Sequence, residues 1–156
     1  HQADTTRLYL SGPVAAGLAA DLSGGPLSVI AIDGGIGAAS ALKMAYAGWT
    51  KGSSALLLAL FAYAAEMGVD GPLLAEWARS QPQLPDQLEG RAAGVGPKAW
   101  RFVGEMEEIA SALRGVGMTG GFHDGAAATY AALASFKDAS PPPDLAAVVE
   151  ALRAGD

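Results

Sequence analysis

The feature that most constrains this chain is a stretch from Ile36 to Met67 that contains no proline and little charge. Such a stretch predicts one helix of roughly 30 residues, about 45 Å long at the standard rise per residue. Gly68, directly after it, is a typical helix stop. Because this helix would be apolar on most of its sides, we expect it to lie in the middle of a helical body.

Shorter helices are expected after Gly68, where apolar residues recur at three- and four-residue spacing. The predicted segments are 72–80, 85–93, 98–113, 122–136 and 144–153. Asp70 and Asp144 are the expected N-caps of two of them. A loop is expected over 94–97, and 140–143 (Ser-Pro-Pro-Pro) is expected to be a stiff linker.

A strand–helix–strand unit is expected before the long helix. Residues 7–10 alternate polar and apolar side chains, and residues 27–32 are rich in β-branched ones, so both segments are predicted strands. Residues 13–22 between them have helical spacing. Two strands alone are marginally stable, so this unit needs a larger sheet to join.

Composition excludes several classes of function. The formal charge of −6 argues against a nucleic-acid partner. The absence of cysteine rules out disulfides and thiolate metal sites, and with two histidines we expect no metal. The longest apolar run, 55–65, is too short to span a bilayer, so no membrane partner is expected. A cytoplasmic location is compatible with these features.

Residues 35–40 read Gly-Ile-Gly-Ala-Ala-Ser and are similar to the dinucleotide-binding pattern G-x-G-x-x-G/A. A working site of this type is followed by a second strand and by an acidic residue about 20 positions on. Here the predicted helix runs past that point, over 53–60, without either. We therefore interpret these glycines as a flexible turn with close helix packing.

Polar residues form a stripe on the long helix. Ser40, Lys43, Thr50, Lys51 and Ser54 recur at three- and four-residue spacing and share one helical face. A lysine amine inside an apolar body is costly unless it meets a carboxylate, a phosphate or water, and such an amine suits proton transfer. The alternative is that Lys43 merely extends to solvent. Spacing alone leaves both interpretations open, but the proton-transfer interpretation depends on this amine being held inside the apolar helical body, where a reacting oxygen can meet it.

Residues 37–44 resemble the G-x-x-x-x-x-K-x-x-x-N signature of β-hydroxyacid dehydrogenases, with Lys43 as its lysine. Later segments are similar to a 6-phosphogluconate dehydrogenase-like subgroup of NAD(P)-dependent oxidoreductases. These segments are 43–46, 49–53, 74–77, 98–102, 105–109 and 136–138. The resemblance covers nearly the whole chain.

The resemblance implies a mainly α fold, the helical C-terminal-like domain of 6-phosphogluconate dehydrogenase, built on one long helix. Residues 1–34 would be a strand–helix–strand remnant of a Rossmann domain, and residues 35–156 the helical domain for dimerisation and substrate binding. It also implies a homodimer, a missing N-terminal Rossmann domain and a small-molecule substrate. NAD or NADP would bind in the full-length protein, and no cofactor is expected on this chain alone.

By the same resemblance, Lys43 would be the catalytic lysine that relays the hydroxyl proton of a small hydroxy acid or related alcohol. Such a group is needed because hydride leaves carbon only as the oxygen loses its proton. The family's asparagine is Ala47 here, so Thr50 or Lys51 would take its place in binding the substrate. Ser40 and His123 are further substrate-binding candidates.

The family's cofactor-contacting Lys-Asp pair falls on Gly104 and Glu105, so Arg101 is the candidate replacement for the lysine and Glu105 the second cofactor-binding candidate. From the residues alone, Glu105, Glu107 and Glu108 are expected to form a solvated face, with pairing of Glu105 to Lys43 or Arg101 as the alternative. On this interpretation the chain is part of a dehydrogenase and inactive alone. The alternative is a stand-alone helical module, without redox activity, for dimerisation or small-ligand binding. Three tryptophans are expected to anchor the core or an interface: Trp49, Trp77 and Trp100.

Overall fold

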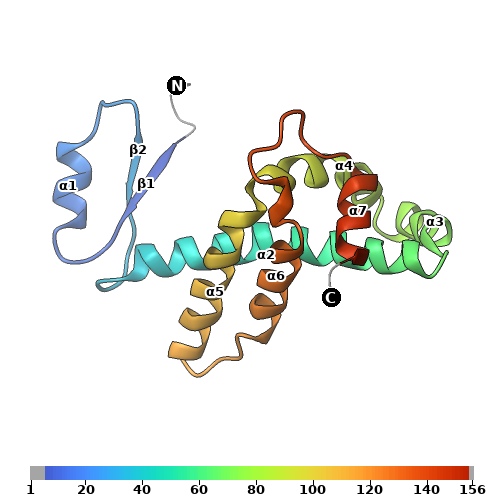
Figure 1. The fold of residues 1–156 in the computed structure, drawn as a ribbon. Coiled ribbons are helices and arrows are strands. Elements are labelled where there is room, and N and C mark those ends of the chain that lie inside the picture. Colours follow the sequence, from blue (N-terminus) through green and yellow to red (C-terminus); the bar gives the residue numbers. More distant parts are fainter. Residues whose placement is uncertain (1–5, 155–156) are drawn as a thin grey trace. The chain divides into compact units, whose positions relative to one another are not determined.

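The structure, a computed structural model, describes residues 6–154. Helices dominate it, and the described chain contains two short strands (Figure 1). The expected fold class, mainly α with a preceding strand–helix–strand unit, is therefore confirmed. The chain divides into two compact units, the first ending at Tyr46 and the second beginning at Ala47. The predicted domain boundary between residues 34 and 35 stays a prediction.

The first unit contains the predicted strand–helix–strand motif. Strand β1 (Arg7–Leu10) pairs in parallel with β2 (Ser28–Ala31), and helix α1 (Ala15–Asp21) connects them. The register aligns Arg7 with Ser28 and Leu10 with Ala31. Among the described residues the sheet has only these two strands. Both of its edges therefore lack a further strand in the described chain.

Helix α2 (Ala38–Glu66) confirms the prediction of one long helix. Two glycines of the turn before it, Gly34 and Gly37, have φ values of 127° and 96°, which residues with a Cβ rarely adopt. After this turn the described chain contains no further strand. Residues 34–37 form a bend and turn that lead directly into α2, and the interpretation that 35–40 do not bind a dinucleotide stays a prediction.

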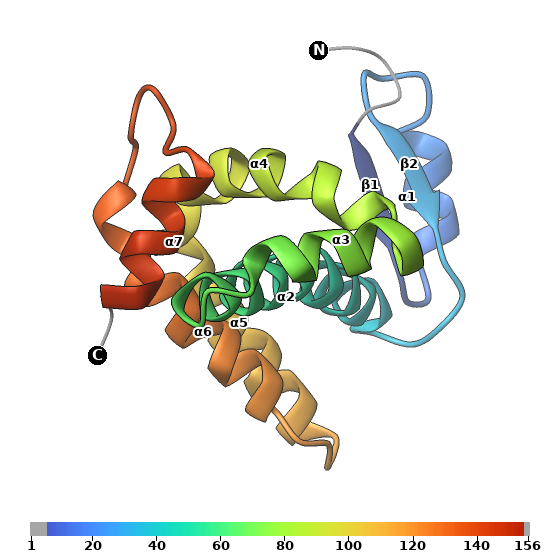
Figure 2. The ribbon, with the colours of Figure 1, turned by 90° about the vertical axis from the view of Figure 1, so that its right-hand side faces the viewer.

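The second unit packs seven further helical elements of the described chain with the greater part of α2. Helices α5 and α6 run side by side as a hairpin, as both ribbon views show (Figures 1 and 2). The elements are, in chain order, α3 (Asp70–Ser80), α4 (Gln83–Val95), the 3₁₀ turn η1 (Gly96–Lys98), α5 (Ala99–Gly115), α6 (Gly121–Ala132), the 3₁₀ turn η2 (Ala134–Phe136) and α7 (Leu145–Ala154).

Local signals at the helix ends were predicted with mixed success. The Asp144 carboxylate accepts a hydrogen bond from the backbone N–H of Ala147 at 2.8 Å, so this N-cap is confirmed. The prediction for Asp70 was wrong, because it is already the first residue of α3. The prediction of a loop at 94–97 was wrong, because all four residues are helical. Pro143 is buried, and a Cβ on Gly96 would overlap its ring, so this proline is packed and not part of a free linker.

One face of α2 is buried in the second unit. Leu57, Phe61 and Ala62 belong to an apolar cluster that also contains Trp77 of α3, Leu88 of α4 and Val149 of α7. The opposite face is uncovered, so the expectation that α2 lies in the middle of the body is only half right. Trp77 is a core residue, whereas Trp49 and Trp100 are 73% and 40% exposed. Within residues 6–154, each helix is too short or too polar to cross a bilayer.

Candidate functional site

The most developed polar arrangement in the second unit surrounds Lys51. The Lys51 ammonium forms an ion pair with the carboxylate of Glu105 on α5. It also lies 4.8 Å from the ring centroid of Phe102, one turn before Glu105 on the same helix. The Lys51 side chain is 25% exposed. A carboxylate and an aromatic face therefore hold this ammonium in one place while part of it still reaches solvent.

Tyr130 of α6 contacts the same region through both its hydroxyl and its ring. Its side chain is fully buried, and its hydroxyl donates a hydrogen bond to the backbone oxygen of Lys51 at 2.6 Å. Its ring meets Phe102 edge-on, with centroids 5.3 Å apart. Burial raises the pKa of Tyr130, and the negative charge of Glu105 adds to the shift, while Arg91 opposes it. The raised pKa keeps this hydroxyl protonated at neutral pH, so it can donate the hydrogen bond to Lys51.

Arg91 of α4 binds two serines of α2, of which Ser54 belongs to the polar stripe. Its Nη1 donates to the hydroxyls of Ser53 and Ser54, each at 3.0 Å. Its Nε and Nη2 both donate to the side-chain oxygen of Gln87, at 3.1 and 2.6 Å. The Ser54 hydroxyl in turn donates to the Thr50 backbone oxygen at 3.0 Å. This part of the stripe thus joins α4 to α2.

His123, at the start of α6, packs against the bare backbone of α2. A Cβ on Gly48 would lie 3.0 Å from His123 Nε2, and one on Gly52 would lie 3.0 Å from the ring of Phe122. His123 Nε2 is 3.4 Å from the Gly48 oxygen, and Nδ1 is buried with no hydrogen-bond partner in the described chain. The substrate-binding role of His123 stays a prediction. In the structure its ring packs against α2 at Gly48 and Gly52, where no side chain blocks it.

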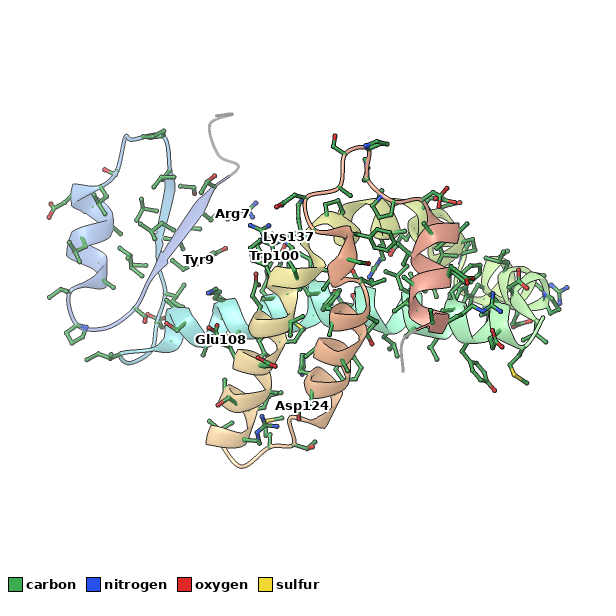
Figure 3. All side chains as sticks on the ribbon, viewed as in Figure 1. Arg7, Tyr9, Trp100, Glu108, Asp124 and Lys137 are labelled. Atoms are coloured by element: carbon green, nitrogen blue, oxygen red, sulfur yellow. The ribbon has the colours of Figure 1, made fainter. Side chains whose placement is uncertain are left out.

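Asp124, the acidic residue next to His123, pairs with a residue of α5 outside the Lys51 region. Asp124, labelled in Figure 3, forms an ion pair with Arg114 at 2.7 Å. Asp124 and Glu107 line a shallow depression of about 270 Å³ between α5 and α6, together with Val103 and three alanines. This depression contains none of the predicted site residues, so we do not regard it as the functional site. The described residues include no group of three histidine or carboxylate side chains that could hold a metal.

Lys43 belongs to the first unit and is exposed. No described residue forms an ion pair or a hydrogen bond with its ammonium. The expectation that this amine is held inside an apolar body was therefore wrong. The physical reason is local: every residue from 40 to 46 is exposed or only half-buried, so this part of α2 is not covered in the described chain. Ser40 is exposed as well.

The alternative in which Glu105 pairs with Lys43 or Arg101 was wrong, because Glu105 pairs with Lys51. Arg101 is exposed. The cofactor-binding roles of Arg101 and Glu105 stay predictions. Sequence reasoning gave no role to Phe102, Tyr130 or Arg91. Phe102 could have been found from its position one turn before Glu105, whereas Arg91 carried no local signal.

Comparison with known proteins places the helical part in context. Residues 64–133 match the model of a domain of unknown function, DUF1932, which is known as the C-terminal helical domain of 6-phosphogluconate and hydroxyacid dehydrogenase-like proteins. The matched range includes Arg91, Phe102, Glu105 and Tyr130, and it excludes both lysines of α2. No curated protein matches the chain.

A solved structure extends the similarity to the whole fold. It is that of a conserved hypothetical protein from Sinorhizobium meliloti 1021, with 26% sequence identity and a TM-score of 0.83 over 97% of this chain. The match covers 52% of the other protein, so this chain spans about half the length of that relative. The fold of both units is therefore shared with a protein about twice as long.

Proposed function

We propose that this chain is the C-terminal helical part of an NAD(P)-dependent oxidoreductase acting on a small hydroxy acid or related alcohol. The similarity of residues 64–133 to a domain of dehydrogenase-like proteins supports the class of protein. This similarity is the observation that carries the proposal, and Lys43 is the candidate group for its chemistry. Its amino group lies on α2, at the lysine position of the family signature, exposed and bound to no described residue. It is thus available to a reacting oxygen.

The chemistry assigned to Lys43 is proton transfer. When an alcohol is oxidised to a carbonyl, the carbon gives up a hydride and the oxygen gives up a proton. An amine within hydrogen-bond reach of that oxygen takes the proton as the C–O double bond forms. Ser40 lies one turn before Lys43 on α2 and is the nearest predicted partner for a substrate hydroxyl.

Lys51 is the proposed recognition residue for an acidic group of the substrate. The family's asparagine is Ala47 here, which cannot donate a hydrogen bond from its side chain. Lys51 lies one turn later, and Glu105 and Phe102 fix its ammonium. A fixed cation binds a carboxylate with less loss of side-chain entropy than a mobile one. Thr50 and His123 remain secondary candidates for substrate contact.

The described residues do not themselves fit a dinucleotide. The sheet of the described chain has two strands, and the turn after β2 leads into α2 with no following strand. NAD or NADP is therefore assigned to a missing N-terminal Rossmann domain, with Arg101 and Glu105 as the candidate contacts from this chain. The cytoplasmic location is likewise a prediction, which cell fractionation would test.

The experiment uses the longer protein that contains this chain, with NAD⁺ or NADP⁺ and a panel of small hydroxy acids. Lys43→Ala should lower kcat by about 10²- to 10⁴-fold, the usual contribution of a general base. Cofactor binding and helix content should be unchanged. Lys98→Ala, which removes another exposed lysine, is the matched control. Undiminished turnover in Lys43→Ala would remove Lys43 from the mechanism.

Lys51 is tested separately, through substrate affinity. Lys51→Met keeps the aliphatic length of the side chain but removes its charge, so it should raise KM for an acidic substrate far more than it lowers kcat. A fall in kcat with unchanged KM would contradict a recognition role. The alternative of a stand-alone module without redox activity predicts no turnover with any member of the panel, and the DUF1932 match does not favour it.

A further inference from the structure

The ion pair between Lys51 and Glu105 presents two opposite charges side by side in the second unit. The two side chains are 25% and 38% exposed, and both are less exposed than the members of the other ion pairs of the described residues. The Phe102 ring also holds the Lys51 ammonium, and the Tyr130 hydroxyl holds the Lys51 backbone. Both charges therefore keep fixed positions and are still reached by solvent.

Both members of the pair retain hydrogen-bonding capacity. An ammonium has several N–H donors, and in the described chain the only hydrogen bond from the Lys51 ammonium goes to Oε2 of Glu105. The other carboxylate oxygen of Glu105, Oε1, receives no hydrogen bond from a described residue. A ligand can therefore accept a hydrogen bond from Lys51 and donate one to Glu105 at the same time.

The pair is neutral as a whole, and this restricts the ligands that it binds well. A simple carboxylate that approaches Lys51 also comes close to the Glu105 carboxylate, whose repulsion offsets the attraction. A ligand that brings an ammonium to Glu105 and a carboxylate to Lys51 makes opposite charges alternate around the site, so each hydrogen bond is charge-assisted. In an amino acid these two groups are attached to the same carbon, which holds them as close together as the members of the ion pair.

We propose that Lys51 and Glu105 together bind the ammonium and carboxylate of a zwitterionic substrate, a hydroxy acid that also carries an amino group. The proposal rests on the proposed function, in which Lys51 binds the acidic group of the substrate. Glu105 is then the specificity-determining residue, and it contacts the substrate in place of the cofactor. The balance of the reaction is that of any alcohol oxidation: the carbon of the alcohol transfers a hydride to NAD⁺ or NADP⁺, its hydroxyl loses a proton, and the ammonium group is unchanged.

The experiment uses the longer protein that contains this chain, with pairs of probes that differ in one group. Each pair consists of a hydroxy amino acid and the acid of the same chain length in which a hydroxyl replaces the amino group, and the pairs increase in chain length. Binding is measured by calorimetry, and turnover is measured with NAD⁺ or NADP⁺. The unchanged protein should bind the amino acid of the best pair about 10- to 100-fold more tightly, the range expected for a hydrogen bond between charged groups. Equal or weaker binding of the amino acid in every pair would overturn the proposal.

A charge-removing variant tests Glu105 itself. Glu105→Gln keeps the size of the side chain and should abolish or reverse the preference, because the ammonium loses its partner and the simple acid is no longer repelled. Glu108, labelled in Figure 3, is exposed, lies one turn later on α5 and forms no ion pair with a described residue, so Glu108→Gln is the matched control and should keep the preference. A structural role of Glu105 would weaken binding of both members of a pair equally, and a cofactor role would weaken only binding of NAD⁺ or NADP⁺. Either result leaves the preference unchanged and would overturn the proposal.

The two readouts separate this proposal from the one on which it rests. Preferred binding of the amino acid without turnover of any probe would contradict the oxidoreductase proposal and support the recognition site. Turnover of simple hydroxy acids, with no preference for the amino acid, would overturn the recognition site and leave the oxidoreductase proposal in place.

Discussion

The closeness of α6 to α2 can be tested with one added methyl group. Gly48→Ala would place a Cβ 3.0 Å from His123 Nε2 and 3.4 Å from Ile109 Cγ2. Ile109 is 3% exposed, so it has little freedom to move away. The substitution gains about 0.5–1 kcal/mol from helix propensity. Overpacking a close contact costs about 1–3 kcal/mol, so the net effect should be between neutral and about 2.5 kcal/mol destabilising.

Gly104→Ala, in the interior of α5, is the matched control. A Cβ there meets nothing within 4 Å, so only the propensity gain of about 0.5–1 kcal/mol should remain. The measurement is urea unfolding of both variants, followed by circular dichroism and compared at equal slopes. If Gly48→Ala were as stabilising as Gly104→Ala, the histidine ring would not lie against the α2 backbone, and the packing described here would be wrong.

Three further predictions follow from single contacts. Because the pKa of Tyr130 is raised in the folded state, the free energy of unfolding should fall above about pH 10, by up to about 1.4 kcal/mol per pH unit. Tyr130→Phe should show a smaller fall. The measurement is urea unfolding of both proteins from pH 9 to 11. Asp144→Ala removes the acceptor of the Ala147 N–H and should cost about 1 kcal/mol in thermal unfolding, whereas Asp144→Asn should cost less. Arg91→Lys cannot reach both serines and Gln87 at once and should cost about 1–2 kcal/mol; an unchanged unfolding midpoint would show that this contact does not stabilise the fold.

The regular elements were predictable because their signals are local. The absence of proline and the stop at Gly68 set the ends of α2 to within two residues. Alternation in residues 7–10 and β-branching in residues 27–32 identified both strands. The cap at Asp144 follows from the side chain itself. Each of these depends on neighbours within a few positions along the chain.

The partner of Lys51 was not predictable in the same way. Glu105 is 54 residues away, and one turn of helix decides whether it meets Lys43, Lys51 or Arg101. That choice depends on how α5 and α6 pack on α2, where the starting residues of α6 lie against Gly48 and Gly52. No residue near Glu105 in the sequence indicates which basic side chain it reaches in the fold.

The exposure of Lys43 was mispredicted for another physical reason. The argument for its burial used the apolar character of α2 as a whole, but burial requires a covering element at each turn. Leu57 and Leu58 have one, whereas residues 40–46 do not in the described chain. Helix composition gives the average environment of a helix and not the environment of one residue.

The central claim, that the Lys43 amine takes the substrate proton, is tested most directly by chemical rescue. Lys43→Ala of the longer protein is assayed with NAD⁺ or NADP⁺ while small primary amines of different basicity are added. If the claim holds, amines restore turnover, the rate rises with amine basicity, and Lys98→Ala shows no response. A variant that keeps its activity, or a loss that no amine restores while cofactor and substrate still bind, would contradict it.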